Sequence, residues 1–84
     1  MSTLTVESQA LASEVTFTDH EFIVSLVDGR TLTVPLEWFP RLTQASKGQL
    51  RRYELLGDGE GIHWPDLDED ISVAGLLRGA SARN

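Results

Sequence analysis

The feature that most constrains the fold is a pair of turn sequences, Asp19-His20 and Asp28-Gly29, inside a stretch where apolar and polar residues alternate. Alternation with a period of two is typical of β-strands that bury one face, and here it runs from Glu14 to Val34. Strands joined by such short turns pair with their sequence neighbours and run antiparallel. The sequence therefore predicts a three-stranded antiparallel meander that ends at Pro35, because proline cannot donate to a β-ladder.

The register of the second turn follows from how each loop length sorts the side chains onto two faces. A two-residue loop would pair Val27 with Arg30 and would mix apolar and polar residues on both faces. A three-residue loop with Gly29 in the left-handed conformation pairs Leu26 with Arg30 instead. Because a slip of one residue exchanges the two faces, the loop that separates them is strongly favoured. It places Val15, Phe17, Phe22, Val24, Leu32 and Val34 on a core face and Thr16, Thr18, Ile23, Ser25, Thr31 and Thr33 on a wet face.

After the meander the pattern changes to short helical segments. Residues 36–42 suit a short helix with Pro40 near its first turn, where a missing N–H costs little. Ser46 and Gln49 have the spacing of a capping box, which predicts a second helix running through residues 50–52. Residues 53–56 suit either the end of that helix or a new strand, and the sequence leaves both open.

The last part of the chain is predicted to hold a short hairpin and a terminal helix. The loop at 57–61 leads into a strand, Ile62-His63-Trp64, which Pro65 ends. Ser72 then caps a short helix over residues 73–78, and Gly79 closes it. We therefore expect an α+β protein with a three-stranded antiparallel meander, a helical segment, a short hairpin and a short C-terminal helix.

The chain has 84 residues, which fits one small domain, and we place this domain at residues 14–79. We expect residues 1–13 to be a mobile N-terminal tail and residues 80–84 to be a C-terminal tail. The absence of cysteine excludes disulfides and thiolate metal sites. No apolar run approaches the ~20 residues that span a bilayer, and no signal-peptide pattern is present. We therefore expect a cytoplasmic protein without membrane contact.

Charge is unevenly distributed along the chain. Lys and Arg total 7 against 13 Asp and Glu, and a net charge of −6 disfavours non-specific binding to nucleic acid or anionic lipid. Four cations and no acid lie between Arg41 and Arg52, whereas seven acids and no cation lie between Glu54 and Asp70. Arg51 and Arg52 are weak candidates for nucleic-acid contact, and pairing of the basic segment with the acidic block is the simpler interpretation.

Two motifs invite a ligand but lack its full pattern. Gly57-x-Gly59-x-Gly61 resembles part of a phosphate-binding loop, but it precedes a strand and contains two acids, so we expect a tight hairpin loop. Asp66-x-Asp68-x-Asp70 resembles the start of a calcium loop. Ile71 and Leu77 stand where that loop needs Gly and Glu. We therefore expect no tight metal site and no cofactor.

His63 is the remaining candidate for catalysis. A general acid–base pair with Glu60 or Asp66 is conceivable, because imidazole titrates near neutral pH. A small metal-assisted enzyme would use His63 with Asp66, Asp68 or Asp70. No nucleophile stands out beside His63, and a hydrogen-bonded strand histidine is the simpler interpretation, so we assign no catalytic residue.

Trp38, Phe39 and Trp64 are the large side chains around these loops. In a small protein such side chains usually fill the core. An exposed aromatic side chain beside the acidic block would instead be a binding anchor. The sequence leaves these two interpretations open.

Two stretches of the chain resemble a known family. The first is Asp28-Gly29-Arg30 with Val34-Pro35-Leu36-x-Trp38-Phe39-Pro40-Arg41-Leu42, and the second runs from Glu54 through Gly57-Asp58-Gly59-Glu60-Gly61-Ile62-His63-Trp64-Pro65-Asp66 to Val73. Together they resemble the small bacterial family called domain of unknown function 2442. This resemblance implies a compact α+β fold, no established activity and no assigned catalytic residues. Some relatives have an added helix-turn-helix domain, and others are encoded beside a second small protein, which has prompted a toxin–antitoxin hypothesis.

One leading hypothesis and several alternatives follow. We expect a small acidic cytoplasmic binding module, the antitoxin-like member of a two-protein system, with a basic protein as its partner. The alternatives are the metal-assisted enzyme, a DNA-contacting component of a repressing complex, although DNA binding by this chain alone is not expected, and a homodimer formed through a strand edge. The expected partner-binding residues are Asp58, Glu60, His63, Trp64, Asp66, Asp68 and Glu69.

Overall fold

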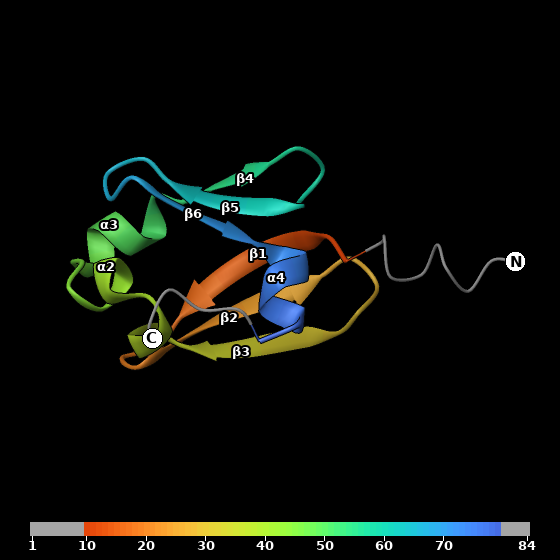
Figure 1. The fold of residues 1–84 in the computed structure, drawn as a ribbon, viewed down its shortest axis with the longest axis horizontal. Helices are drawn as coiled ribbons and strands as arrows, with labels where there is room; N and C mark the ends of the chain where they lie inside the picture. Colours follow the sequence, from red (N-terminus) through yellow and green to blue (C-terminus); the bar gives the residue numbers. More distant parts are fainter. Residues whose placement is uncertain (1–9, 80–84) are drawn as a thin grey trace, which may run out of the picture.

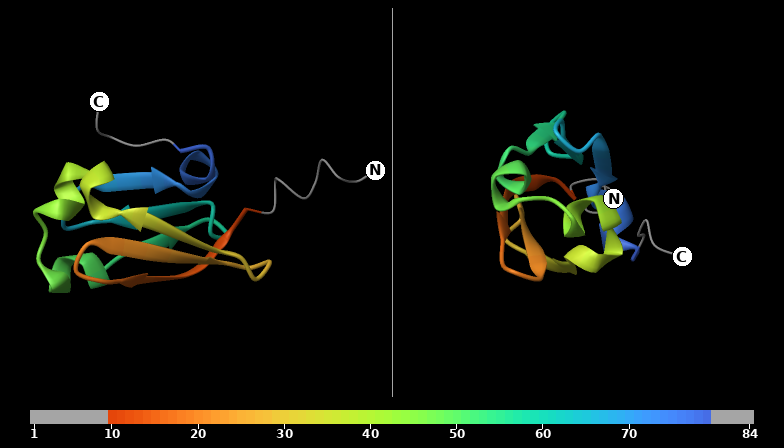
Figure 2. Two further views of the ribbon diagram at one scale, coloured as in Figure 1. Left: turned by 90° about the horizontal axis from the view of Figure 1, so that it is seen from below. Right: turned by 90° about the vertical axis from the view of Figure 1, so that its left-hand side faces the viewer.

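The computed structural model describes residues 10–79, and within them the chain forms two three-stranded antiparallel sheets and four short helical segments (Figure 1). The first sheet lies below the second in this view, and the inner faces of both sheets contribute to one core. Helices α2 (Pro40–Thr43) and α3 (Lys47–Arg51) lie together at one end of the sheets, while α4 (Val73–Leu77) lies nearer the other end (Figure 2). The expected α+β fold is confirmed.

The first sheet is the predicted meander. It consists of β1 (Ala12–Phe17), β2 (Glu21–Leu26) and β3 (Thr31–Pro35), in that spatial order. The amide of Leu26 donates a hydrogen bond to the carbonyl of Arg30 at 2.8 Å, and Gly29 has a φ of 98°. The three-residue loop and its register are therefore confirmed, and the ladder pairs Phe22 with Val34.

Strand β1 begins two residues earlier than the expected domain boundary at Glu14. Ala12 is buried and pairs with Leu26, and the register then shifts by one residue at a bulge between Ala12 and Glu14. Small apolar side chains give little strand signal, so the sequence pattern did not mark this start. Residues 10 and 11 of the expected N-terminal tail are also described, with Ala10 buried and the Leu11 carbonyl hydrogen-bonded to the Val27 amide, whereas residues 1–9 and 80–84 lie outside the described residues.

The helical segment after β3 is divided at Phe39. A 3₁₀ turn, η1 (Leu36–Trp38), precedes helix α2 (Pro40–Thr43). The prediction of one continuous helix over residues 36–42 is therefore wrong. Phe39 is extended, with φ −132° and ψ 97°, as is usual for a residue before proline. Its side chain is buried in the core.

Helix α3 (Lys47–Arg51) begins at the predicted capping box. The Ser46 hydroxyl accepts a hydrogen bond from the Gln49 amide at 3.1 Å, and the Gln49 side chain accepts one from the Ser46 amide at 3.0 Å. These reciprocal bonds satisfy backbone donors that have no partner within the helix.

The second sheet contains one strand more than the predicted hairpin. Its strands are β4 (Glu54–Leu56), β5 (Gly61–Trp64) and β6 (Glu69–Ser72). Strand β6 was missed because most of its residues are acidic or polar, and acids are depleted in strands. Its burial of Ile71 against Ile62 outweighs that weak propensity. Ser72 then caps α4 (Val73–Leu77), as predicted.

The mainly aliphatic core between the two sheets contains a group of aromatic side chains. Phe22 and Trp64 are fully buried, with ring centroids 6.1 Å apart in an edge-to-face arrangement. Such pairs stabilise a core beyond the burial of their area alone. Helices within residues 10–79 have at most five residues, and none is long and apolar enough to cross a membrane.

Candidate functional site

The outer face of the second sheet has two rows of side chains that point away from the core. Because side chains alternate along a strand, the inward Leu55–Ile62–Ile71 row alternates with outward rows. One outward row consists of Glu54, His63 and Asp70, which the ladder sets side by side across the three strands. The next row consists of Leu56, Gly61 and Ser72.

Leu56 forms the apolar part of this outer face. Its side chain is 42% exposed, and it lies over Gly61, where an added Cβ would come within 3.3 Å of the Leu56 Cδ1. Neither Gly61 nor Ser72 has a large side chain to cover Leu56. The outward position of Leu56 is not evident from the sequence, because it depends on residues 53–56 forming a strand rather than ending a helix.

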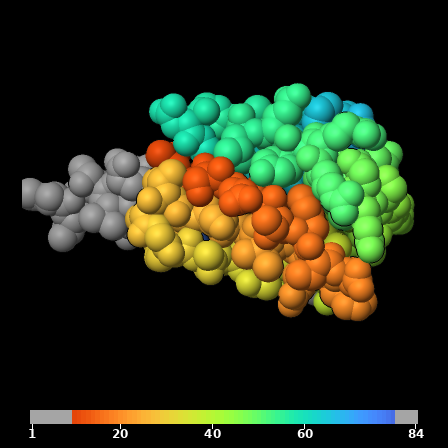
Figure 3. Space-filling view, turned by 180° about the vertical axis from the view of Figure 1, so that it is seen from behind, coloured from red at the N-terminus to blue at the C-terminus, as the bar shows by residue number. Residues whose placement is uncertain are grey.

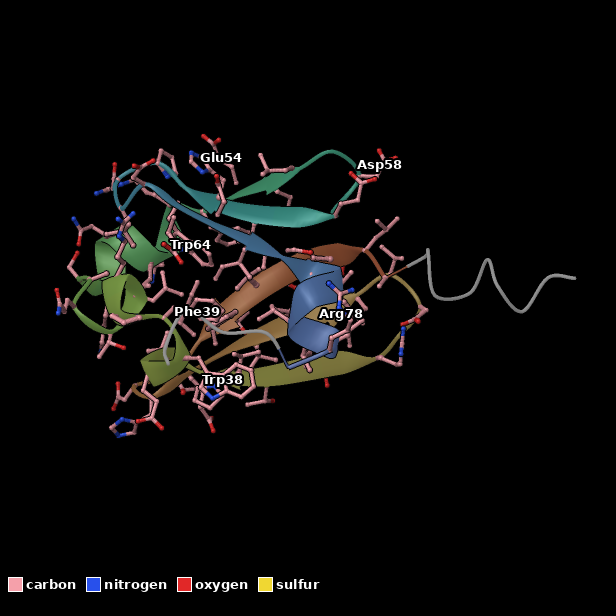
Figure 4. All side chains as sticks on the ribbon, in the orientation of Figure 1. Trp38, Phe39, Glu54, Asp58, Trp64 and Arg78 are labelled. Carbon is pink, nitrogen blue, oxygen red and sulfur yellow. The ribbon has the colours of Figure 1, made fainter. Side chains whose placement is uncertain are left out.

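Four carboxylates lie on this outer face or in the hairpin loop beside it. In the described part of the chain, no ion pair joins Lys or Arg to Glu54, Asp58, Glu60 or Asp70. Glu54 and Asp58 project away from the core at the top of Figure 4. We call this surface the acidic face, and it consists of Glu54, Leu56, Asp58, Glu60, His63 and Asp70.

His63 contacts Asp70, not the carboxylates of Glu60 or Asp66 that were first considered. Its Nδ1 is hydrogen-bonded to Oδ1 of Asp70 across the β5–β6 ladder. The nearby Ser72 hydroxyl accepts a hydrogen bond from the Gly75 amide at 3.1 Å and caps α4. Residues 10–79 hold no group of three or more His, Cys, Asp or Glu side chains that could bind a metal ion. Among the described residues, His63 is therefore a paired strand histidine without an adjacent free nucleophile.

The glycine-rich loop is a hairpin, as predicted, and it serves packing. Gly59 has a φ of 111° and is buried against β1. The Ala12 amide donates a hydrogen bond to its carbonyl at 2.8 Å. A Cβ at Gly59 would lie 2.3 Å from the Ala12 carbonyl oxygen, so no side chain fits there. The loop thus joins the second sheet to the first instead of opening toward a phosphate.

The acidic block of the sequence does not form one surface. Asp58 and Glu60 lie in the β4–β5 loop, whereas Asp66 and Asp68 lie in the β5–β6 turn at the opposite end of β5 (Figure 1). Successive loops of an antiparallel sheet necessarily fall at opposite ends. The expected single patch over Asp58–Glu69 is therefore corrected to two separate clusters.

The acidic cluster at the β5–β6 turn is paired with two arginines. Arg52 Nε donates to Asp66 Oδ2 at 2.6 Å, and Arg41 Nη1 donates to the Asp68 carbonyl at 2.6 Å and lies 3.9 Å from Glu69 Oε1. Asp68 adopts a positive φ of 52° in this turn. Arg41 and Arg52 therefore pair with the acidic segment, as the simpler interpretation of the sequence expected. Arg52 is then not free to contact a phosphate. Arg51 is exposed and has no partner among residues 10–79.

Trp64 is a core residue, which corrects its assignment as a possible partner anchor. Its side chain is fully buried, and its Nε1 donates a hydrogen bond to the Leu50 carbonyl at 2.9 Å. A partner cannot contact Trp64 without opening the core. Phe39 is likewise buried, and Trp38 is half-buried (Figure 4).

A groove between β1 and α3 was not identified from the sequence. It has a volume of about 370 Å³, and its walls include Phe17, Lys47, Leu50, Arg51 and Tyr53. Figure 3 shows the orange atoms of β1 beside the green atoms of the segment that follows α2. The meander order already implied that β1 is an edge strand, but the position of α3 beside it depends on tertiary packing.

Comparison with known proteins agrees with this fold and defines the family. The model of the family described as protein of unknown function DUF2442 matches residues 12–82, so the chain belongs to that family. The resemblance seen in the sequence is confirmed. No protein of curated function matches the chain.

Two solved structures are similar to this one. The crystal structure of a protein of unknown function from Rhodospirillum rubrum has a TM-score of 0.76 and 34% identity, with 88% of this chain and 92% of that chain covered. The solution NMR structure of an uncharacterised protein from Chromobacterium violaceum has a TM-score of 0.75 and 25% identity, with 94% of this chain and 76% of that chain covered.

Proposed function

We propose that this protein is a cytoplasmic binding module that captures a basic segment of another protein on its acidic face. The observation that supports this proposal is an exposed Leu56 on a sheet face and hairpin loop that carry four carboxylates, none of which pairs with Lys or Arg within residues 10–79. An apolar centre inside a polar rim is the usual anatomy of a protein interface.

Electrostatics favours a basic partner over a neutral one. Carboxylates that no Lys or Arg neutralises repel one another, and a protein of net charge −6 adds to this repulsion at low ionic strength. Lysines or arginines of a partner would relieve it and would accelerate encounter through long-range attraction. Leu56 alone offers little apolar area on this face, so the proposal is for a partner that associates rapidly and dissociates readily.

In a two-protein system this chain would be the acidic, antitoxin-like member. Direct DNA contact is less well supported, because the β5–β6 turn pairs Arg41 and Arg52, which leaves Lys47 and Arg51 of the basic segment for a phosphate backbone. A catalytic role is also less well supported, because the His63–Asp70 pair has no free nucleophile beside it.

The test is partner capture from the native host by the tagged full-length chain, at low and high salt, with two charge-reversal variants. Glu54→Lys with Asp58→Lys alters the acidic face, whereas Glu14→Lys with Glu21→Lys makes the same change in net charge on the first sheet. We expect the first variant to lose a basic partner that the second retains, and high salt to weaken the capture. Circular dichroism establishes that both variants fold. Equal capture by both variants, or capture of DNA alone, would contradict the proposal.

A further inference from the structure

We infer that the groove between β1 and α3 is a second binding site, which takes an extended acidic peptide segment as an added strand on the edge of β1. This site is separate from the acidic face and has the opposite charge preference. The inference depends on three features of the groove, namely its free backbone groups, its walls and its cations.

The backbone of β1 offers unpaired hydrogen-bonding groups to the groove. The backbone amide of Thr18 donates a hydrogen bond to the Glu21 carbonyl at 2.8 Å. Because inward and outward backbone groups alternate along an antiparallel strand, Thr16 and Thr18 direct theirs toward β2. Val15 and Phe17 therefore direct theirs outward, and the Val15 amide indeed meets the Tyr53 hydroxyl at 3.0 Å. The Val15 carbonyl and both backbone groups of Phe17 have no hydrogen-bond partner within residues 10–79. These three groups match one short stretch of an incoming strand.

The walls of the groove provide apolar and aromatic surface beside that edge. Phe17 is half-buried, and its ring centroid lies 6.2 Å from that of Tyr53. Leu50 and Tyr53 form the wall opposite β1. At about 370 Å³ the groove lies within the size range of sites that accept a few side chains. Alternate side chains of an added strand would face this wall, because side chains alternate along a strand.

The lining of the groove is positively charged on balance, since Lys47 and Arg51 outnumber Asp19. Arg51 has no carboxylate partner among the described residues. Lys47 is loosely paired, with its Nζ 3.6 Å from Asp19 Oδ1 and both side chains 77% exposed. Arginine binds carboxylates through charge-assisted hydrogen bonds. Two cations in a protein of net charge −6 are too few to hold a nucleic-acid backbone, so an acidic peptide fits best.

The experiment selects random twelve-residue peptides displayed on phage against the tagged full-length chain. We expect enrichment of sequences that combine Asp or Glu with alternating apolar residues and that lack proline within the paired stretch. The enriched peptide, synthesised, should shift the amide resonances of Phe17, Arg51 and Tyr53. Methylating its backbone nitrogens should abolish binding, because an added strand must donate hydrogen bonds.

Charge variants separate this site from the rest of the surface. Arg51→Glu should weaken binding of the enriched peptide by about tenfold or more, since a charge-assisted hydrogen bond is replaced by repulsion. Arg78→Glu makes the same charge change in another part of the molecule and should leave binding unchanged. Glu54→Lys with Asp58→Lys should also leave it unchanged, so failure here and failure of the acidic-face proposal are distinguishable. The inference would be overturned if no peptide were enriched, if the enriched sequences were basic, or if the chain selectively bound single-stranded nucleic acid. It would also be overturned if the protein dimerised through β1, or if Arg51→Glu and Arg78→Glu lost peptide affinity equally.

Discussion

The backbone of Gly59 lies directly against that of Ala12, and the Ala12 amide donates a 2.8 Å hydrogen bond to the Gly59 carbonyl. This contact joins the β4–β5 loop of the second sheet to the first strand of the first sheet. The two sheets therefore meet through main-chain atoms at this point, in addition to the side chains of the core.

Replacing Gly59 by alanine should destabilise the protein strongly. The new Cβ would meet the Ala12 carbonyl oxygen at 2.3 Å, and the φ of 111° is already unfavourable for a residue with a side chain. We expect the free energy of unfolding to fall by about 2–4 kcal/mol in urea titrations.

Gly29→Ala is the matched control for this steric effect. Gly29 has a similar φ of 98°, but nothing lies within 4 Å of its added Cβ. Only backbone strain remains there, and the expected loss is about 1–2 kcal/mol. Equal losses in the two variants would show that the Gly59–Ala12 contact contributes nothing beyond strain.

Trp64→Phe tests the hydrogen bond inside the core. The substitution leaves the Leu50 carbonyl without the indole N–H at 2.9 Å and leaves space where Trp64 was fully buried. We expect a loss of about 2–4 kcal/mol in the free energy of unfolding. Trp38→Phe, at a half-buried position, should cost less. A Trp64→Phe variant as stable as the natural chain would argue against this buried contact.

The first sheet was predictable because its information is local. Alternation fixed which side chains of β2 and β3 face the core, and the Asp28-Gly29 turn fixed the register. Strand β6 was not predictable in this way, since Glu69 and Asp70 join a sheet only because Ile71 can bury itself against Ile62. Local strand propensity cannot predict a contact between residues that are distant in the sequence.

The candidate site was predictable only in part for the same reason. The contact between His63 and Asp70 follows from the register of β5 with β6, so it could not be chosen over Asp66 without that strand. Trp64 remained undecided because burial depends on the inner faces of both sheets meeting. Tyr53 could not be linked to Val15, since the two residues approach only when α3 packs beside β1.

The carboxyl of Asp28 should have a pKa below its ordinary value. The Arg30 side chain donates from Nε at 2.8 Å and the Arg30 amide donates at 3.0 Å, and these hydrogen bonds, the side-chain one first, lower the pKa of Asp28 below its ordinary 3.8. A carboxyl with a depressed pKa stabilises the fold above its ordinary pKa, and the effect disappears as pH falls through the lowered value. Arg30→Gln should raise the pKa of Asp28 toward 3.8 in an NMR titration, whereas Arg78→Gln should not.

The two acidic clusters should respond in opposite ways to neutralisation. Asp66 accepts a hydrogen bond from Arg52 at 2.6 Å, so Asp66→Asn should lower the free energy of unfolding by up to about 1 kcal/mol. Asp58 has no cationic partner within residues 10–79 and belongs to a face of like charges, so Asp58→Asn should leave stability unchanged or raise it by about 0.5 kcal/mol or less. Added salt should narrow the difference between the two variants, because it screens both the attraction and the repulsion. Urea titrations at low and high salt measure these changes. A loss in Asp58→Asn as large as that in Asp66→Asn would mean that the hairpin carboxylate stabilises the fold, and the acidic face would then lose the main reason for a basic partner.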